Sequence, residues 1–212
     1  EQIAGHFEMA LRLWQQPVQL ALKSNRDLHE LTIVTNDRPA LFASITGALT
    51  AWGMDIVRAS AFSNRSGTIV DKFFFKDCFN TLVLNPSERG RFQKSITQVL
   101  SGEEPLEHLL RRRASARKAP PAKVKVETRL TFDNSCSTHS TLLELIAQDC
   151  PGLLYRVTSI LSQCKCNLEV ALIDTEGQMA IDVFYVTSEG AKLTDEHQEQ
   201  LREALVAELD KQ

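Results

Sequence analysis

The hydrophobic and polar positions of this chain form two series that predict the same elements in the same order. Each series begins with a short apolar run, 31–35 or 142–147, which ends in a polar turn and is typical of a buried strand. Apolar residues at helical spacing follow, and they are Leu41, Phe42, Ile45, Leu49 and Trp52 in the first series and Leu153, Leu154, Val157, Leu161 and Cys164 in the second. Extended segments come next, over 55–62, 68–76, 167–173 and 179–187.

A second helix closes each series. Asn85-Pro86-Ser87-Glu88 is a capping signal with proline inside it, and Gly102 marks the end of this helix. The counterpart begins near Thr194 and carries Leu201, Leu205 and Leu209 on one face. Residues 124–132 predict a last strand for the first series, whereas the second series ends with its helix. The order β-α-β-β-α-β is typical of helices that cover one face of an antiparallel sheet.

The two series are an internal repeat. LTIVTNDRPALF (31–42) aligns with LELIAQDCPGLL (143–154) at an offset of 112, and IVDKFFF (69–75) aligns with AIDVFYV (180–186) at an offset of 111. Two ordered blocks at nearly one offset indicate a duplication. We therefore expect an α+β protein of two tandem ferredoxin-like units, with antiparallel sheets whose outer strands pair and with helices on one face.

The domain boundaries follow from the repeat. We expect a helical appendage over 1–28 with an apolar stripe of Ile3, Phe7, Leu11 and Trp14, left from an upstream domain. The first unit is expected over 29–133, with a basic linker inserted at 103–122 before its last strand, and the second unit over 140–212. Because the chain begins at Glu1 rather than methionine, we expect it to be a fragment of a longer protein.

Composition excludes several classes of function. The net charge is −3, which argues against a nucleic-acid coat, and no apolar run reaches the roughly 18 residues of a membrane span. Five cysteines without framework spacing and without a secretory signal favour reduced thiols in the cytoplasm. The segment RRRASARKAPPAKVK (111–125) has seven basic residues and predicts either a phosphate-binding arm or a solvated linker. Without interleaved aromatic residues the linker is favoured, and no nucleic-acid partner is expected.

Motifs for catalysis are missing from the sequence. It contains no phosphate-binding loop, dinucleotide-binding motif, zinc-protease motif or nucleophile elbow, so we expect no catalytic residue, no metal and no cofactor. Cys164-Lys165-Cys166 lacks further metal ligands nearby. Asp71 and Asp182 occupy equivalent strand positions, where acid–base chemistry is one interpretation. The alternation with apolar neighbours favours the other, a solvent-facing position.

The repeated turn is the best candidate site. Asp37-Arg38-Pro39-Ala40-Leu41 and Asp149-Cys150-Pro151-Gly152-Leu153 join a strand to a helix, with each proline expected at the first helical position. The open N–H groups of a helix start suit a carboxylate or another polar group of a ligand. Capping by the aspartate is the structural alternative, and the spacing leaves both open. The glycine of the second turn leaves more room than Ala40, which ranks the second turn above the first.

These residues resemble a known family. The D-x-P-G-L turn, units of 70–80 residues and the tandem repeat are similar to ACT domains, which are amino-acid-binding regulatory modules. NDRPALFASITGALTAWGMDIVRA, TLLELIAQDCPGLLYRVTSIL and IDVFYV further resemble the C-terminal tandem ACT region of bacterial bifunctional uridylyltransferase/uridylyl-removing enzymes, which act on the PII signalling protein. The resemblance implies a glutamine-sensing region that controls nitrogen metabolism. It also implies upstream nucleotidyltransferase and HD domains that carry the catalysis and its Mg²⁺.

The resemblance also implies a set of ligand-binding residues: Asn36, Asp37, Pro39, Ala40, Leu41, Phe42, Asp55, Gln148, Asp149, Pro151, Gly152, Leu153, Leu154 and Asn167. Ala40 in place of glycine and Cys150 in place of arginine depart from the family pattern. The implied partners are glutamine and, through the parent enzyme, PII, with a homodimer formed through strand or helix pairing. Two alternatives stay open: an interaction module that binds no amino acid, and an ACT region of another enzyme, such as a (p)ppGpp synthetase or an aspartate kinase.

Overall fold

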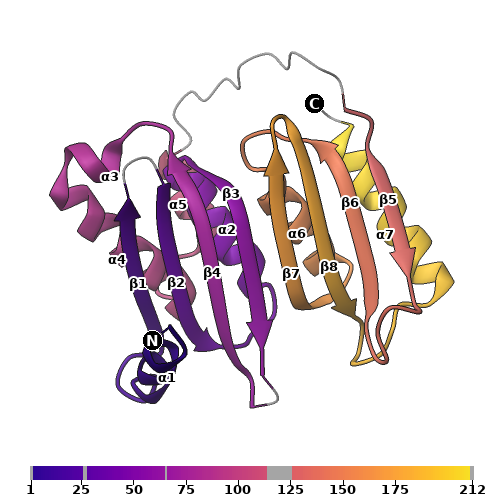
Figure 1. The fold of residues 1–212 in the computed structure, drawn as a ribbon, viewed down its shortest axis with the longest axis horizontal. Coiled ribbons are helices and arrows are strands. Elements are labelled where there is room, and N and C mark those ends of the chain that lie inside the picture. The colour runs from indigo at the N-terminus through magenta and orange to yellow at the C-terminus, as the bar shows by residue number, and fades with distance from the viewer. Residues whose placement is uncertain (1, 26–27, 65, 114–125, 211–212) are drawn as a thin grey trace.

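A computed structural model describes residues 2–25, 28–64, 66–113 and 126–210 (Figure 1). The first half contains α1 (Gln2–Leu11), β1 (Val18–Asn25), β2 (Leu28–Asn36), α2 (Leu41–Trp52), β3 (Met54–Ser63), β4 (Thr68–Asp77), α3 (Thr81–Leu84), α4 (Pro86–Ser101) and α5 (Leu106–Arg113). The second half contains β5 (Arg129–Asp133), β6 (Thr141–Gln148), α6 (Leu153–Gln163), β7 (Asn167–Glu176), β8 (Met179–Thr187) and α7 (Asp195–Leu209). No helix within these ranges is long and apolar enough to cross a membrane.

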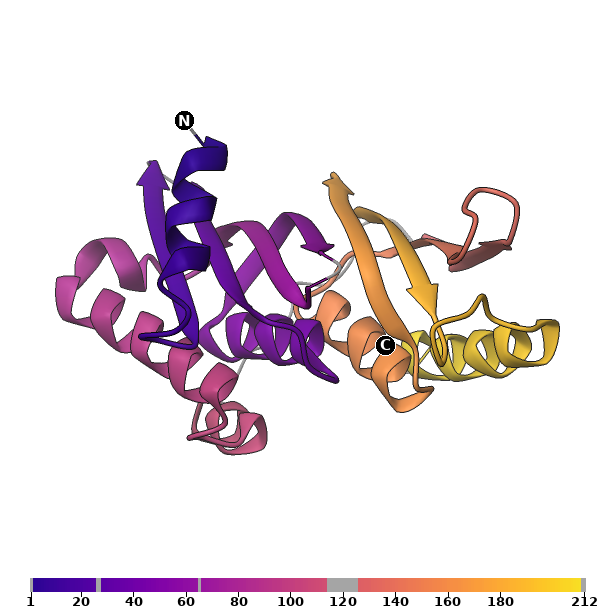
Figure 2. The ribbon, with the colours of Figure 1, turned by 90° about the horizontal axis from the view of Figure 1, so that it is seen from below.

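The strands form one antiparallel sheet of eight, in the order β1-β2-β4-β3-β7-β8-β6-β5. The first four strands with α2 and α4 are called the first unit, and the last four with α6 and α7 the second unit. The order of the second unit mirrors that of the first, and the units join where β3 pairs with β7, from Arg58 opposite Asp174 to Phe62 opposite Val170. Helices α2, α4, α6 and α7 lie on one face of the sheet, whereas α1 lies on the opposite face (Figure 2). The expected α+β class, the tandem units and the pairing of their strands are confirmed.

The edge strand of each unit lies elsewhere in the sequence than expected. Residues 129–133 do not close the first unit, because they pair with β6 of the second. The fourth strand of the first unit is β1, which forms a hairpin with β2. Each unit therefore has the order β-β-α-β-β-α, and the second unit lacks no strand. Apolar Val18, Leu20 and Leu22 alternate with Gln19, Ala21 and Lys23, a strand pattern that the assignment of 1–28 to an appendage overlooked.

The linker expected over 103–122 is partly a helix. Helix α5 packs against α2, with Leu109 fully buried and Leu106 against the core. Arg113 at its end stacks on the Trp52 ring, with 3.1 Å from the guanidinium carbon to the ring centroid, and pairs with Glu88. The basic segment over 114–125 lies outside the described residues. Of the appendage stripe, Phe7, Leu11 and Trp14 are exposed, and the side chain of Ile3 is not described.

Helices α4 and α7 begin as the sequence predicts. The Asn85 side chain accepts a hydrogen bond from the Ser87 N–H, and the Thr194 hydroxyl accepts one from the His197 N–H. Helices α2 and α6 begin differently, because Leu41 and Leu153 are their first residues and each preceding proline lies outside the helix. The expectation that both prolines sit at the first helical position is wrong by two residues, although both turns do join a strand to a helix.

A two-fold pseudosymmetry relates the units where α2 crosses α6. The hydroxyls of Thr46 and Thr158, which lie 112 residues apart, are 3.0 Å from each other at the centre of this buried contact. Beside them, Gly47 lets the helices approach closely. A Cβ built at Gly47 would lie 2.7 Å from Leu106 Cδ2 and 2.8 Å from Tyr155 Cε2. A side chain at position 47 would therefore force Leu106 and Tyr155 to shift.

The substitution Gly47→Ala is expected to lower the free energy of unfolding by roughly 1–3 kcal/mol, because the new methyl group overlaps two packed side chains. Gly90→Ala is the matched control, since Gly90 also lies inside a helix but has open space around its Cα. The control should raise the free energy of unfolding by roughly 0.5–1 kcal/mol through helix propensity. Urea denaturation of both variants checks this, and equal shifts would contradict the tight junction.

Candidate ligand pockets between the two units

The two repeated turns are anchored in the same way. The Asp37 N–H donates to the Gly67 carbonyl at 2.7 Å, and the Asp149 N–H donates to the Gln178 carbonyl at 2.9 Å. Each turn is thus held by a hydrogen bond to the β-hairpin of its own unit. The residue before each helix is left-handed, with φ of 59° at Ala40 and 80° at Gly152. A left-handed alanine is strained relative to glycine, so the departure at Ala40 changes the sequence but not the backbone path.

Neither aspartate caps its helix. The helix starts at Leu41 and Leu153 have no side-chain cap, so capping does not explain the turns. Helix geometry leaves the first N–H groups without an intrahelical acceptor. The N–H groups of Phe42 and Ala43 in the first unit therefore point to the space before α2, which suits an anionic group.

A cavity of about 510 Å³, called the first pocket, lies at the junction. One wall is the turn 37–43 of the first unit, and the opposite wall is the end of α6 and the start of β7, including Lys165, Asn167 and Glu169. Ala61 of β3 and Asp71 of β4 lie in its depth. The volume falls within the range of small-molecule sites, and both units are needed to enclose it.

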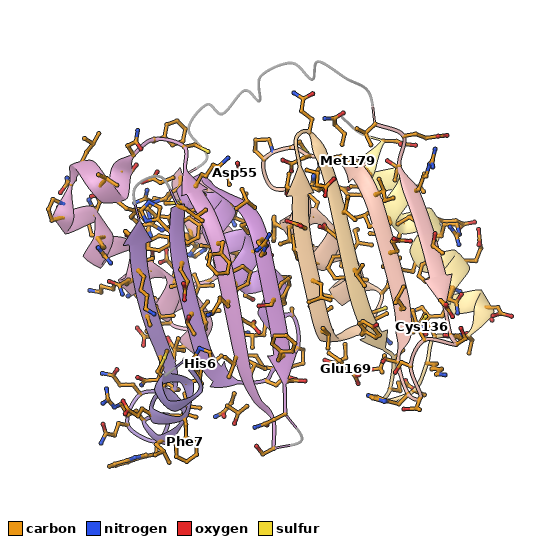
Figure 3. The ribbon with its side chains drawn as sticks, in the orientation of Figure 1. His6, Phe7, Asp55, Cys136, Glu169 and Met179 are labelled. Carbon is orange, nitrogen blue, oxygen red and sulfur yellow. The ribbon has the colours of Figure 1, made fainter. Side chains whose placement is uncertain are left out.

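The equivalent second pocket is almost closed, with a volume of about 30 Å³. It lies between the turn 149–154 and the end of α2, with Asp55 and Met54 of β3 on the far wall. Labels for Asp55 and Glu169 show that the two pockets lie at opposite ends of the paired strands β3 and β7 (Figure 3). The second pocket has space for about one water molecule.

Most of the residues implied by the resemblance line one of these pockets. The first pocket contains Asp37, Pro39, Ala40, Leu41, Phe42 and Asn167. The second contains Asp55, Asp149, Gly152, Leu153 and Leu154. Three residues line neither: Asn36, Pro151 and Gln148. The Gln148 side chain instead bonds the Val126 N–H and the Gln178 carbonyl. Asn167 belongs to the second unit but lines the pocket at the first turn, and Asp55 belongs to the first unit but lines the pocket at the second turn. Each pocket therefore combines the turn of one unit with the first residues of a strand of the other.

Bulk at equivalent positions accounts for the closure of the second pocket. Ile173 stands where the first pocket has Ala61, Met54 stands where it has Cys166, and Thr50 stands where it has Ser162. Two exchanges run the other way, with Ala180 for Ile69 and Leu154 for Phe42. Ile173 is directly opposite Asp182 in the strand register, as Ala61 is opposite Asp71. The isoleucine therefore fills the space beside the aspartate that the alanine leaves empty.

Charge also distinguishes the pockets. The first pocket has two cations at its exposed edge, Arg38 and Lys165. The Arg38 guanidinium donates a hydrogen bond to the Val99 carbonyl at 3.3 Å. The positions equivalent to Arg38 and Lys165 are Cys150 in the second unit and Gly53, the C-cap residue of α2, in the first unit. Among the described residues that line the second pocket are three carboxyl groups and no lysine or arginine. Only the first pocket thus offers both charges to a ligand.

The strand aspartates are buried, which corrects the expectation that they face solvent. Asp71 is 3% exposed and Asp182 is 1% exposed, on the face covered by helices. Burial raises the pKa of Asp71 to about 8, and the Asp37 carboxylate adds to this against a backbone hydrogen bond from Phe62. Burial likewise raises the pKa of Asp182 to about 8, with the Asp149 carboxylate contributing. The prediction from the alternating pattern was wrong because the solvent-facing side of β8 is apolar too. The pattern of apolar and polar residues therefore did not distinguish the buried face of this strand from its open face.

The volumes of the two pockets favour the opposite ranking of the two turns from the one that the sequence predicts. The sequence places the second turn first because Gly152 lacks a side chain, but a Cβ at Gly152 would face Thr50 of α2 at 3.1 Å rather than a ligand cavity. The volumes of the two pockets favour the first turn.

The sequence analysis did not assign Ala61, Asp71 or Lys165 to the ligand site. Of these, only Asp71 had a signal in the sequence, because aspartate recurs at the equivalent position in both copies of the strand.

No group of three or more histidine, cysteine, aspartate or glutamate side chains suited to a metal ion occurs within the described ranges. The Cys164-Lys165-Cys166 segment carries a different arrangement. His197 Nε2 is 2.8 Å from the Cys164 carbonyl oxygen and 3.8 Å from Cys166 Sγ. Burial raises the pKa of the Cys166 thiol to about 12. These contacts tie the end of α6 to α7.

Comparisons with known proteins identify a family match in the second unit. Residues 129–212 match the family described as ACR9-like, ACT-like domain. The matched residues are those of the second unit, which is therefore similar to ACT-like domains. The first unit has the same order of elements and is related to the second by the internal repeat.

The tandem is similar over most of its length to three curated enzymes named bifunctional uridylyltransferase/uridylyl-removing enzyme. It is 36% identical over 194 residues to that of Gluconobacter oxydans, which covers 87% of this chain and 20% of the relative. It is 36% identical over 197 residues to that of Azospirillum brasilense, with 89% and 21% covered. It is 33% identical over 219 residues to that of Vibrio campbellii, with 99% and 24% covered. The chain thus spans about a fifth to a quarter of the length of these relatives.

Among solved structures, aspartate kinase from Synechocystis is similar with a TM-score of 0.46 at 11% identity, covering 98% of this chain and 39% of that chain. The regulatory subunit of aspartate kinase from Thermus thermophilus gives a TM-score of 0.26 at 13% identity, with 91% and 99% covered.

Proposed function

We propose that this tandem of ACT-like units is a regulatory region that binds a free α-amino acid, glutamine, in the first pocket. The observation that supports the proposal most is the pocket itself, which is enclosed by both units and has a deep acid and cations at its edge. An α-amino acid carries an ammonium and a carboxylate on one carbon, so it matches both charges. Because the ligand touches both units, binding can alter how they are joined.

The wider role follows from the relatives. We propose that the region belongs to a uridylyltransferase/uridylyl-removing enzyme and shifts it between adding UMP to PII and removing it, in control of nitrogen metabolism. The catalysis and its Mg²⁺ are then assigned to other domains of that enzyme. The choice of glutamine rests on this likeness, because the pocket's charges select an α-amino acid and not one side chain.

Titration calorimetry with L-glutamine tests the proposal. We expect one ligand per chain, because the second pocket has about 30 Å³ and the first about 510 Å³. L-asparagine and L-glutamate serve as matched controls that differ in length or in the terminal group. Two ligands per chain would show that the second pocket opens. No binding of any amino acid would favour an interaction module, which pull-down of PII would then examine.

A further inference from the structure

Asp71 is a buried carboxyl group that lines the first pocket and has no cationic partner among the described residues. It lies at the middle of β4, opposite Ile33 of β2 and Ala61 of β3, and its side chain is buried yet borders the cavity. None of the ion pairs in the described part of the chain involves Asp71. A carboxyl group at such a site loses hydration without gaining a counter-charge, so it is stable only when protonated.

The charged and titratable groups that line the first pocket together with Asp71 come from both units. They are Asp37 and Arg38 of the first turn, and Lys165, Cys166 and Glu169 of the second unit. Arg38 and Lys165 are exposed at the edge, and Glu169 is engaged by His139 at 2.9 Å. The cations thus remain near solvent, whereas the Asp71 carboxyl, which accepts a backbone hydrogen bond from Phe62, borders the interior of the cavity. A ligand with its own cation is the partner that this arrangement lacks.

We propose that Asp71 binds the ammonium group of the amino acid and releases its carboxyl proton to solvent when the ligand enters. This inference rests on the proposed function and names the residue that recognises the amino group. The carboxyl group loses H⁺ to water, and the resulting carboxylate pairs with the ammonium, so the buried charges cancel. The ligand's carboxylate then lies toward the open N–H groups at the start of α2 and the cations of the edge.

The second pocket supplies an internal comparison. Asp182 occupies the position equivalent to Asp71, but Ile173 fills the adjoining space, and Asp182 Oδ1 has no hydrogen-bond partner among the described residues. Both carboxyl groups have their pKa raised to about 8, yet only Asp71 borders a cavity of ligand size. At pH 7, Asp182 therefore keeps its proton whether or not a ligand is present.

The test is calorimetry with L-glutamine in phosphate and in Tris buffer, whose different ionisation enthalpies report the protons released. At pH 7 we expect close to one proton released per ligand, and at pH 8 about half as many, because Asp71 has a pKa of about 8 and is half ionised there. The dissociation constant should fall by up to tenfold between pH 6 and pH 7.

Asp71→Asn should weaken binding at least tenfold, abolish proton release and remove the pH dependence. Asp182→Asn is the matched control and should keep wild-type affinity and proton release. Glutaramic acid, which is glutamine without its amino group, should bind the wild type at least tenfold more weakly than glutamine. In Asp71→Asn the two compounds should bind alike, and circular dichroism of each variant checks that it is folded.

The outcomes separate this inference from the proposed function. Wild-type affinity of folded Asp71→Asn, or glutamine binding without proton release, overturns the role of Asp71 and leaves an amino-acid site in place. Failure of every amino acid to bind the wild-type chain overturns the proposed function and this inference with it.

Discussion

Replacing Ala61 by isoleucine is expected to abolish amino-acid binding to this chain. Ala61 borders the first pocket beside Asp71, and the second unit carries Ile173 at the equivalent position, where the cavity has only about 30 Å³. The larger side chain would enter the ligand's space and leave the surrounding backbone unchanged, since the fold already accepts isoleucine beside a strand aspartate. The dissociation constant for L-glutamine should rise at least 100-fold in calorimetry.

Ala61→Ser is the control, because serine is close to alanine in size and should leave the affinity within a few-fold of the wild type. Thermal melting of both variants checks folding. If Ala61→Ile binds glutamine as tightly as the wild type does, the amino acid occupies another site and the first pocket is not the sensor.

Stability is expected to fall as pH rises from about 4 to about 8, because of the two buried aspartates. The ordinary pKa of an aspartate carboxyl is 3.8, and in the fold burial raises the pKa of Asp71 and of Asp182 to about 8. Between these values the folded chain binds more protons than the unfolded chain. The stability that each protonated carboxyl provides is complete below pH 4 and is lost as pH rises toward 8.

The double variant Asp71→Asn/Asp182→Asn should flatten this dependence, because amides do not titrate. Relative to the variant, the wild type should lose on the order of 1 kcal/mol or more of unfolding free energy per pH unit for each buried carboxyl. Urea denaturation between pH 5 and pH 8 measures the difference. Asp210→Asn, at an exposed helix end, is the control and should follow the wild type. Parallel curves for the double variant and the wild type would mean that these carboxyls are ionised in the fold.

Much of the fold was predictable because local patterns agree with it. The apolar run, the turn, the helical spacing and the hairpin appear twice at offsets of 112 and 111, and a duplicated pattern cannot easily arise by chance. The caps at Asn85 and Thr194 were also predictable from the sequence. In each cap the side chain accepts a hydrogen bond from a backbone N–H only two or three residues further along the chain. The edge strands were misplaced because short amphipathic segments at 18–25 and 129–133 can pair with either neighbour, and the sequence does not state the partner.

The candidate site was predictable only in part, for a similar reason. The sequence by itself determined that two turns with an aspartate, a proline and a small residue begin two helices, and that the chain consists of paired repeats. Only the tertiary structure decided that each pocket is shared across the β3–β7 junction, that Asp71 and Asp182 face inward, and that Ala61 against Ile173 leaves one pocket open and the other closed. Local preferences act over a few residues, whereas the space beside an aspartate depends on side chains from strands and helices that meet only in the folded chain.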